Sequence, residues 1–433
     1  MSPDGMLGCA ARRPRRPGWL IGCWLLTRAT MLCLFLALAT FIRNDVVYYA
    51  DSVLTRPWPI LDDIRGVLTE YPTGSVWFLQ LVSWSSARDT DAYVLVFALL
   101  LAALDALAAA ALYLFESRTA AWLWAGAGAL LGPLLWFRFD LVPALCVLAA
   151  LYWLRRRPAL AGALLAVGAG LKLWPALLLV PMVGVSAPAR RRMLGFGITG
   201  LVLTTISVAS QGLARTLSPL GYQSQRGLQI ESVWATPLMV SRLWSGSGGP
   251  HVEYSQFQAY EIFGSSVGAW ERGASVSTVL VVLLAAIFVW LIGLGGVGLP
   301  GHRLPLVEDD RHEHAILLAG LALVCAFLVA DKTLSPQYLT WIFGPLVLAI
   351  ARLAHSRQRA PVPWLAVLGA ATIGLTQLIY PLSYGGLVSS VDPNAGSTLL
   401  LALRNGALIA LTAYSLAQAL RLSMRVGVGT APQ

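Results

Sequence analysis

The chain of 433 residues is 57% hydrophobic and only 12% charged, with a mean hydropathy of +0.69. Because a soluble domain carries about 25% charged residues, this composition excludes an ordinary soluble protein and indicates a polytopic protein embedded in membrane lipids. We attribute the net charge of +10 to arginine on the cytoplasmic side of the membrane rather than to binding of nucleic acid.

The first apolar run, residues 19–42, follows four arginines in the N-terminal tail. It is too long for a signal peptide, so we expect an uncleaved anchor that leaves the N-terminus in the cytoplasm. Further runs of about 18 to 25 apolar residues recur along the chain, and each can cross a bilayer. Placing every basic cluster in the cytoplasm gives about twelve crossings with both termini inside. This predicts a single all-α domain over residues 1–433 in the plasma membrane.

The first extracytoplasmic loop is predicted at residues 43–91 and opens with the sequence RNDVVYYADS. Within it, residues 60–68 carry apolar side chains at helical spacing, which predicts an interfacial helix. Residues 75–84 form a second apolar piece that is too short to span and is also expected in the interface. The other large loop is predicted at residues 212–273.

The arginine clusters at residues 155–157 and 190–192 are both expected in the cytoplasm. The chain between them must cross and return with only about 15 residues per arm, or roughly 22 Å. Its tip, which holds Lys172, should therefore lie below the outer surface, where irregular backbone requires surrounding protein or a water-filled cavity. Lys172 either binds a phosphate at the cavity wall or extends its ammonium from a helix end to the interface.

Several other charged residues are ambiguous on sequence alone. Lys332 closes a predicted span at the outer face, either as a functional cation or as an ordinary interfacial lysine. Arg138 and Asp140 either pair with each other or leave Arg138 for a phosphate, and Arg226 and Glu231 in the large loop leave the same choice open.

Asp45 and Asp51 lie just outside the first span, with Tyr48 and Tyr49 between them. A carboxylate in this place either acts as a general base for an acceptor hydroxyl or is a solvated loop residue. Asp45 is nearer the membrane and is the preferred base. No metal-ligand spacing is present, and no cofactor is expected.

Five segments keep a common order: RNDVVYYADS, the pair Tyr71-Pro72, RFDLVPALCVLAALYWLRRRPALAGALLAVGAGLKLWPALLLVP, RGLQIESVWATP and KTLSPQYLTWIFGPL. Together they resemble family-87 glycosyltransferases of actinobacteria, which include polyprenyl-phosphate-mannose-dependent mannosyltransferases that extend phosphatidylinositol mannosides. The resemblance covers nearly the whole chain. It implies a GT-C fold, a polyprenyl-phosphate sugar donor and a glycolipid acceptor, with the active site on the extracytoplasmic side.

The resemblance also implies roles for particular residues. The family's general base is an aspartate in the first loop, and Asp45 is the matching position. A histidine is also catalytic in related mannosyltransferases, and the position we match to it, before LSPQY, holds Lys332 here. Candidate ligands of the donor phosphate are Lys172, Lys332 and Arg226. Candidate contacts for the acceptor or sugar are Tyr48, Tyr49, Asp51, Glu231, Gln337 and Tyr338.

Two other classes fit the same composition. A transporter or lipid flippase also suits about twelve crossings, but such proteins place charges in mid-span and show internal repeats. Here the polar groups other than Lys172 are expected in loops, and no repeat is visible. A non-catalytic membrane scaffold would not need a buried lysine beneath an acidic loop.

Overall fold

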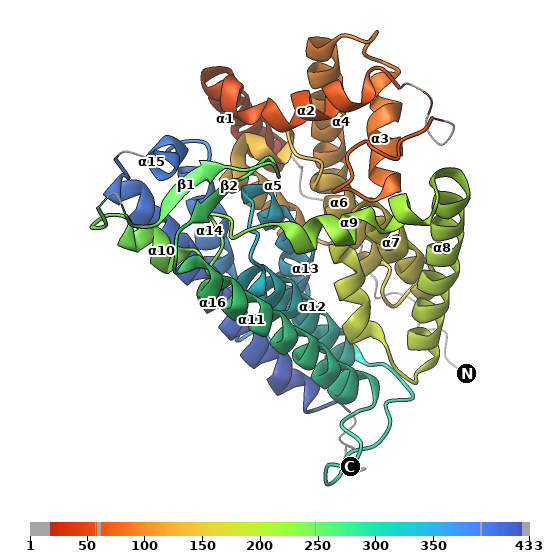
Figure 1. Cartoon of the computed structure of the whole chain (residues 1–433). Coiled ribbons are helices and arrows are strands. Elements are labelled where there is room, and N and C mark those ends of the chain that lie inside the picture. Colours follow the sequence, from red (N-terminus) through yellow and green to blue (C-terminus); the bar gives the residue numbers. More distant parts are fainter. Residues whose placement is uncertain (1–17, 57, 59–61, 247, 390–391, 427–433) are drawn as a thin grey trace, which may run out of the picture.

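The computed structural model describes residues 18–56, 58, 62–246, 248–389 and 392–426. Long helices run roughly side by side through the molecule, and shorter elements gather at one end (Figure 1). The N-terminal arginines and residues 59–61 lie outside the described residues. The longer helices are α1 (Gly18–Ile42), α4 (Thr90–Ala111), α5 (Arg118–Leu131), α6 (Leu141–Tyr152), α7 (Pro158–Leu171), α8 (Ala187–Gln211), α11 (Val267–Phe288), α12 (Asp310–Ala330), α13 (Phe343–Ala354), α14 (Val362–Ile379) and α16 (Ala395–Ser423).

The shorter elements connect these helices. Short stretches of tighter or wider helix extend several of the long ones, at Leu112–Glu116, Gly132–Leu135, Val289–Gly293 and Pro336–Ile342. A longer 3₁₀ stretch, Trp174–Met182, follows α7. The remaining elements are α2 (Asn44–Val53), α3 (Thr73–Ser83), α9 (Leu213–Gln225), α10 (Thr236–Ser241), α15 (Tyr384–Val388) and the antiparallel hairpin β1 (His251–Tyr254) with β2 (Tyr260–Phe263).

In the described part of the chain, eight helical segments are long and apolar enough to cross a membrane. α6 and α7 are apolar but shorter. These lengths confirm a helical protein of the membrane class, and the number of crossings stays a prediction. The eight segments are Gly18–Leu38, Thr90–Glu116, Ala187–Gln211, Val267–Gly293, Asp310–Ala330, Pro336–Ala354, Val362–Ile379 and Ala395–Ser423.

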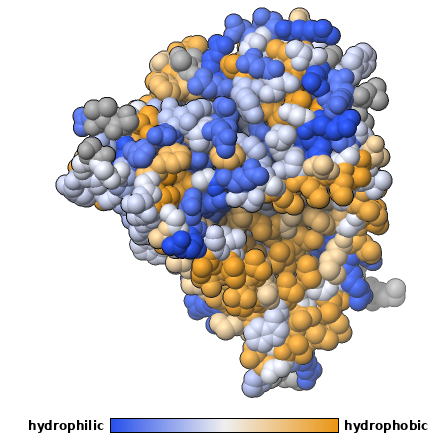
Figure 2. Space-filling view, in the orientation of Figure 1, coloured by the Kyte–Doolittle hydropathy of each residue, from blue (hydrophilic) through white to orange (hydrophobic). Residues whose placement is uncertain are grey.

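The centre of the bundle is formed by α12 and α13, which are buried over most of their length. By contrast α8 and α11 expose leucine, isoleucine and valine along their length. Figure 2 shows such apolar residues over the middle and lower part of one face, with polar residues gathered over the end that carries α2 and α3. We call this the Asp45 end, after the residue in α2.

An ion pair lies inside two of the apolar segments. Arg28 of α1 reaches Asp105 of α4 with two hydrogen bonds of 2.9 Å, and both side chains are buried. Trp124 donates a third hydrogen bond to Asp105 at 2.9 Å. The expectation that polar groups other than Lys172 lie in loops was therefore wrong, because these two charges lie within the spans and neutralise each other there.

The helical hairpin of α7 and α8 packs very closely. A Cβ atom on Gly162 of α7 would lie 1.9 Å from the backbone oxygen of Arg192, and one on Gly195 of α8 would lie 2.0 Å from that of Ala159. Glycine at both positions lets the two backbones touch, as at many membrane helix interfaces. This contact holds α7 firmly, and Lys172 follows directly after its last residue.

The first predicted loop has more regular structure than expected in one place and less in another. RNDVVYYADS is helix α2 rather than loop, and its buried face carries Val46, Tyr49, Ala50 and Val53. The interfacial helix predicted at residues 60–68 was wrong over the described residues 62–68, which form turns. Residues 75–84 do form a short helix, α3.

Candidate active site

Asp45 lies in the first turn of α2 and forms an ion pair with Arg138. Arg138 Nε lies 3.0 Å from Asp45 Oδ2. The side chain of Asp45 is 35% exposed, whereas that of Arg138 is 4% exposed. A helix N-terminus also favours a negative charge. Asp45 is therefore an accessible carboxylate that is held from one side by a buried cation.

Arg138 is fixed by its other donors. Its Nη1 donates to the backbone oxygens of Ile42 at 2.7 Å and Phe137 at 2.8 Å, and its Nη2 donates to the Tyr380 hydroxyl at 3.0 Å. Burial alone would lower the pKa of Arg138, but Asp45, Tyr380 and Tyr49 together more than offset this and leave the pKa above its usual value. The guanidinium therefore stays charged and keeps Asp45 in place.

The two tyrosines of α2 have different surroundings. Tyr48 is partly buried and donates to Glu70 Oε1 at 2.9 Å. Tyr49 is buried, and its hydroxyl lies 3.0 Å from that of Tyr71. Burial raises the pKa of Glu70 above its usual value. Tyr48 thus lies at the accessible side of the site with Glu70, whereas Tyr49 belongs to its wall.

Lys172 begins an irregular backbone segment after α7, as the short arms predicted. Its ammonium lies 2.7 Å from Asp140 Oδ1, and Trp341 Nε1 donates to the same oxygen at 2.5 Å. The rings of Tyr71, Tyr338 and Trp341 surround the ammonium at 5.0 to 5.6 Å from their centroids. Lys172 therefore has a polar partner that the sequence did not reveal, and its side chain is 15% exposed.

Tyr71 links Lys172 to the Asp45 region. Its ring lies under the Lys172 ammonium and packs edge-on against the ring of Tyr49, with centroids 5.8 Å apart. Burial raises the pKa of Tyr71, and the charges of Asp140 and Asp45 contribute to the increase. The structure thus brings Asp45 and Lys172 into one neighbourhood, but aromatic rings occupy space where the sequence predicted a cavity.

Lys332 and Arg226 lie beside each other next to this neighbourhood. The Lys332 ammonium donates to the backbone oxygens of Ser224, at 3.1 Å, and of Arg226. It therefore fixes the C-terminal end of α9 and the residue that follows it. Among the described residues, the buried Nε of Arg226 has no hydrogen-bond partner. Burial raises the pKa of Glu70 and of Asp331 above their usual values. The nearby charge of Arg226 offsets part of this increase in both groups.

The remaining predicted contacts are spread out. Glu231 is fully buried and bonds Arg404 Nη2 at 3.1 Å, and burial raises its pKa to about 7. This burial places Glu231 in the core rather than on an open surface. Tyr338 stacks on Trp341 with centroids 4.2 Å apart. Gln337 is partly buried, and Asp51 is exposed on α2.

Sequence reasoning missed Glu70 and Trp341. It offered Arg138 as the partner of Asp140, whereas the structure pairs Asp140 with Lys172 and Arg138 with Asp45. Glu70 directly precedes Tyr71-Pro72, one of the five segments of the family resemblance, but the resemblance itself gave Glu70 no role. Trp341 lies within an apolar run and gave no signal.

The part of the chain that the structure describes has no group of three or more histidine, cysteine or acidic residues that could hold a metal ion. The chain matches no protein-family model, no curated protein and no solved structure.

Proposed function

We propose that the chain is a membrane glycosyltransferase of the GT-C type. It would move a hexose, with mannose favoured, from polyprenyl phosphate to a hydroxyl group of a glycolipid or lipoglycan on the extracytoplasmic side. The observation that carries the proposal is an accessible carboxylate, Asp45, that is held by buried Arg138 in the same neighbourhood as a largely buried cation, Lys172. The resemblance of five ordered segments to family-87 enzymes supports the same reaction.

In the proposed reaction Asp45 takes the proton of the acceptor hydroxyl. The acceptor oxygen forms a bond to the anomeric carbon while the bond from that carbon to the phosphate oxygen breaks. The bonding electrons leave with the polyprenyl phosphate, which needs no general acid because it is already ionised. A single displacement inverts the anomeric centre, so a β-linked donor gives an α-linked product.

Cations near the departing phosphate would stabilise its developing charge. Arg226 suits this role because it has a buried donor without a partner among the described residues. Lys172 suits this role if its ammonium contacts both Asp140 and the donor phosphate. Lys332 is less suited, because its ammonium already donates to two backbone oxygens.

The activity is tested by incubating membranes that contain the chain with radiolabelled polyprenyl-phosphate-mannose and endogenous lipid acceptors. Labelled glycolipid that appears only with the intact chain supports the proposal. Movement of the intact donor lipid across the membrane, without formation of a glycosidic bond, would instead assign the chain to the rival class of transporters and flippases.

The Lys172–Asp140 pair gives a test that separates stability from activity. Lys172→Met should lower the free energy of unfolding by about 3 kcal/mol, because it leaves the buried Asp140 without its countercharge. Adding Asp140→Asn should recover most of this loss, as measured by the thermal unfolding midpoint in detergent. If Lys172 binds the donor phosphate, the double variant should remain at least about tenfold less active than the parent. Full activity in the double variant would limit Lys172 to a structural role.

A further inference from the structure

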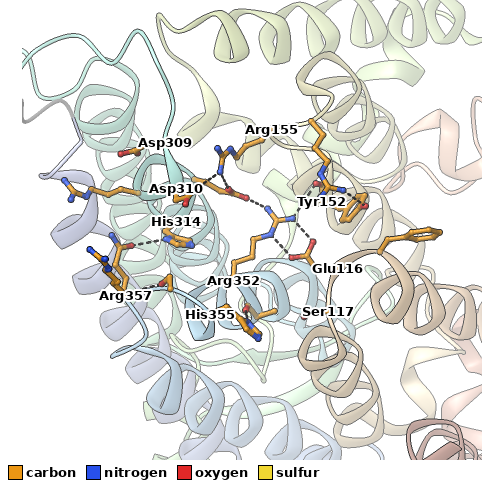
Figure 3. Close-up of a pocket in the computed structure, with 17 residues that line it drawn as sticks. Glu116, Ser117, Tyr152, Arg155, Asp309, Asp310, His314, Arg352, His355 and Arg357 are labelled. Atoms are coloured by element: carbon orange, nitrogen blue, oxygen red, sulfur yellow. Dashed lines mark hydrogen bonds and ion pairs between the residues drawn. The ribbon is translucent and has the colours of Figure 1, made fainter. Parts of the chain in front are cut away.

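A polar cavity of about 1280 Å³ lies far from the Asp45 end (Figure 3). It is lined by the last residues of α6 and α13 and the first residues of α12. Asp140 precedes α6 and Asp331 follows α12, so both belong to the opposite ends of these helices. The 21 residues of α12 separate the two regions by roughly 30 Å at 1.5 Å per residue. The cavity therefore belongs to the face predicted to be cytoplasmic and is separate from the candidate active site.

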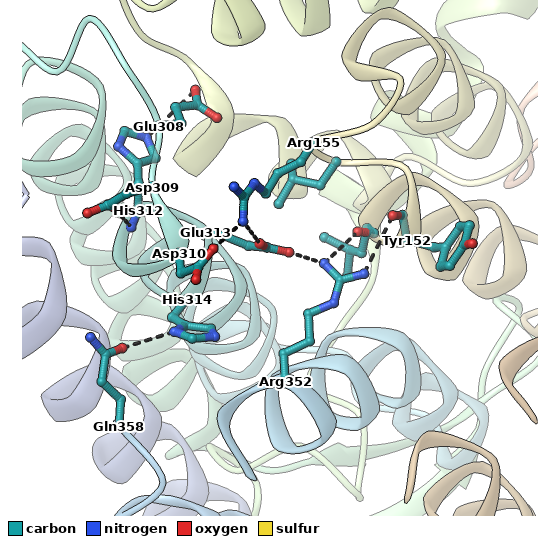
Figure 4. Close-up of polar contacts among 12 residues, drawn as sticks. Tyr152, Arg155, Glu308, Asp309, Asp310, His312, Glu313, His314, Arg352 and Gln358 are labelled. Atoms are coloured by element: carbon teal, nitrogen blue, oxygen red, sulfur yellow. Dashed lines mark hydrogen bonds and ion pairs between the residues drawn. The ribbon is translucent and has the colours of Figure 1, made fainter. Parts of the chain in front are cut away.

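One wall of the cavity is a chain of alternating charges (Figure 4). Arg352 binds both carboxylate oxygens of Glu116 at 2.8 and 2.9 Å and also contacts Glu313. Arg155 bonds the other oxygen of Glu313 at 3.0 Å and contacts Asp310. These two arginines and three carboxylates satisfy one another across four segments, so they form a rigid wall with a net charge of −1.

Three further arginines line the cavity without a countercharge. Among the described residues, Arg156, Arg311 and Arg357 form no ion pair within 4.0 Å. Arg156 bonds only the neutral Tyr152 hydroxyl at 3.2 Å, and Arg311 bonds the backbone oxygen of Arg425 at 3.4 Å. Their guanidinium groups keep donors that can bind an anion. A guanidinium fork matches the oxygens of a phosphate in particular.

Two histidines add to this donor set. His314 Nδ1 lies 3.0 Å from Gln358 Oε1, and His355 Nδ1 lies 2.8 Å from the backbone oxygen of Ala351. Because both partners are oxygen acceptors, the proton of each neutral ring belongs on Nδ1. Nε2 of each ring has no hydrogen-bond partner among the described residues.

The cavity also has an apolar edge. Phe115, which follows the membrane-length helix α4, is 64% exposed and lines the cavity beside Glu116. Arginines that only fix the topology on the cytoplasmic side do not need to line a cavity. A cavity that joins arginines without a countercharge to an exposed aromatic ring suits a ligand with a charged head and an apolar tail.

We propose that this cavity is a binding site for a phosphate monoester group on the predicted cytoplasmic face. The group is carried either by an anionic lipid, whose acyl chain would contact Phe115, or by a soluble phosphate ester. Arg156, Arg311 and Arg357 bind the phosphate oxygens, and the wall around Arg352 holds the site open. This inference does not depend on glycosyl transfer at the Asp45 end.

The test uses the full chain in nanodiscs of zwitterionic lipid, with phosphatidic acid and glycerol 3-phosphate as separate probes. The triple variant Arg156→Gln, Arg311→Gln, Arg357→Gln should weaken binding of at least one probe tenfold or more. The matched control Arg191→Gln, Arg303→Gln, Arg421→Gln removes the same charge from exposed arginines that do not line the cavity. It should change binding less than twofold.

The two probes distinguish the source of the phosphate. Binding of phosphatidic acid that glycerol 3-phosphate does not displace, and that Phe115→Ala weakens, assigns the site to a lipid. If glycerol 3-phosphate displaces phosphatidic acid at similar concentrations, the site recognises the phosphate ester alone. Equal weakening by the cavity variant and the control, or no saturable binding of either probe, would overturn the proposal. A variant with lysine at the three cavity positions should regain part of the affinity. This result would show that the glutamine variant loses binding through its lost charge and not through misfolding.

Discussion

Asp45→Asn is expected to reduce glycosyl transfer at least about a hundredfold, because loss of a general base typically costs 10² to 10⁴ in rate. The asparagine has nearly the same shape, and Arg138 keeps its bonds to two backbone oxygens and to Tyr380. The fold should therefore persist. The measurement is the initial rate of label transfer from polyprenyl-phosphate-mannose, normalised to the amount of folded protein.

The matched control for this prediction is Asp51→Asn on the same helix. Asp51 is an exposed carboxylate six residues further along α2. The resemblance made Asp51 a candidate acceptor contact, but the structure leaves it exposed and outside the Asp45–Arg138 pair, so its loss should change the rate less than about threefold. Full activity of Asp45→Asn would remove Asp45 from the mechanism. Equal loss in both variants would indicate a general effect of charge on this helix.

Asp105→Asn should produce the largest loss of stability, about 3 to 5 kcal/mol, because it leaves the buried guanidinium of Arg28 without its countercharge. Two hydrogen bonds of 2.9 Å join these residues, and Trp124 also donates to Asp105. The loss should appear as a lower thermal unfolding midpoint in detergent or nanodiscs. Transfer activity per folded molecule should change little, because the pair lies within the helices.

The same helix offers the control. Asp91, in the first turn of α4, pairs with Arg43, but its side chain is 78% exposed. An exposed pair contributes at most about 1 kcal/mol, so Asp91→Asn should scarcely move the midpoint. In addition, replacing both buried partners by Arg28→Met and Asp105→Leu should recover most of the stability lost by Asp105→Asn. A similar loss from Asp91→Asn and Asp105→Asn would contradict the special role of the buried pair.

Hydropathy and arginine clusters predicted the long helices well. The apolar runs predicted at residues 19–42, 363–380 and 398–420 correspond to α1, α14 and α16 within a few residues at each end. The length argument also placed Lys172 at the irregular tip of a short helix. These successes share a cause, because lipid permits only helices of sufficient length and makes an isolated charge costly.

What the sequence did not reveal depends on contacts between distant segments. Asp140 lies 32 residues from Lys172, and Trp341 lies 201 residues from Asp140. No local pattern predicts such a cluster. Likewise, RNDVVYYADS reads as a polar loop, but Val46 and Tyr49 are drawn into the core and the segment becomes a helix. Asp45 was accessible to sequence reasoning because a carboxylate beside a membrane span is conspicuous without its partners.

The distance in sequence between Arg28 and Asp105 also affects how the protein is made. The two residues are 77 positions apart, and synthesis at roughly 5 to 20 residues per second separates them by about 4 to 15 s. During that interval Arg28, near the middle of α1, has no carboxylate partner. Insertion of an unpaired arginine into lipid costs about 2.5 to 3.5 kcal/mol. The nascent α1 should therefore remain beside the insertion machinery until α4 arrives. Its final membrane position would then be reached as a helix pair rather than as a solitary anchor.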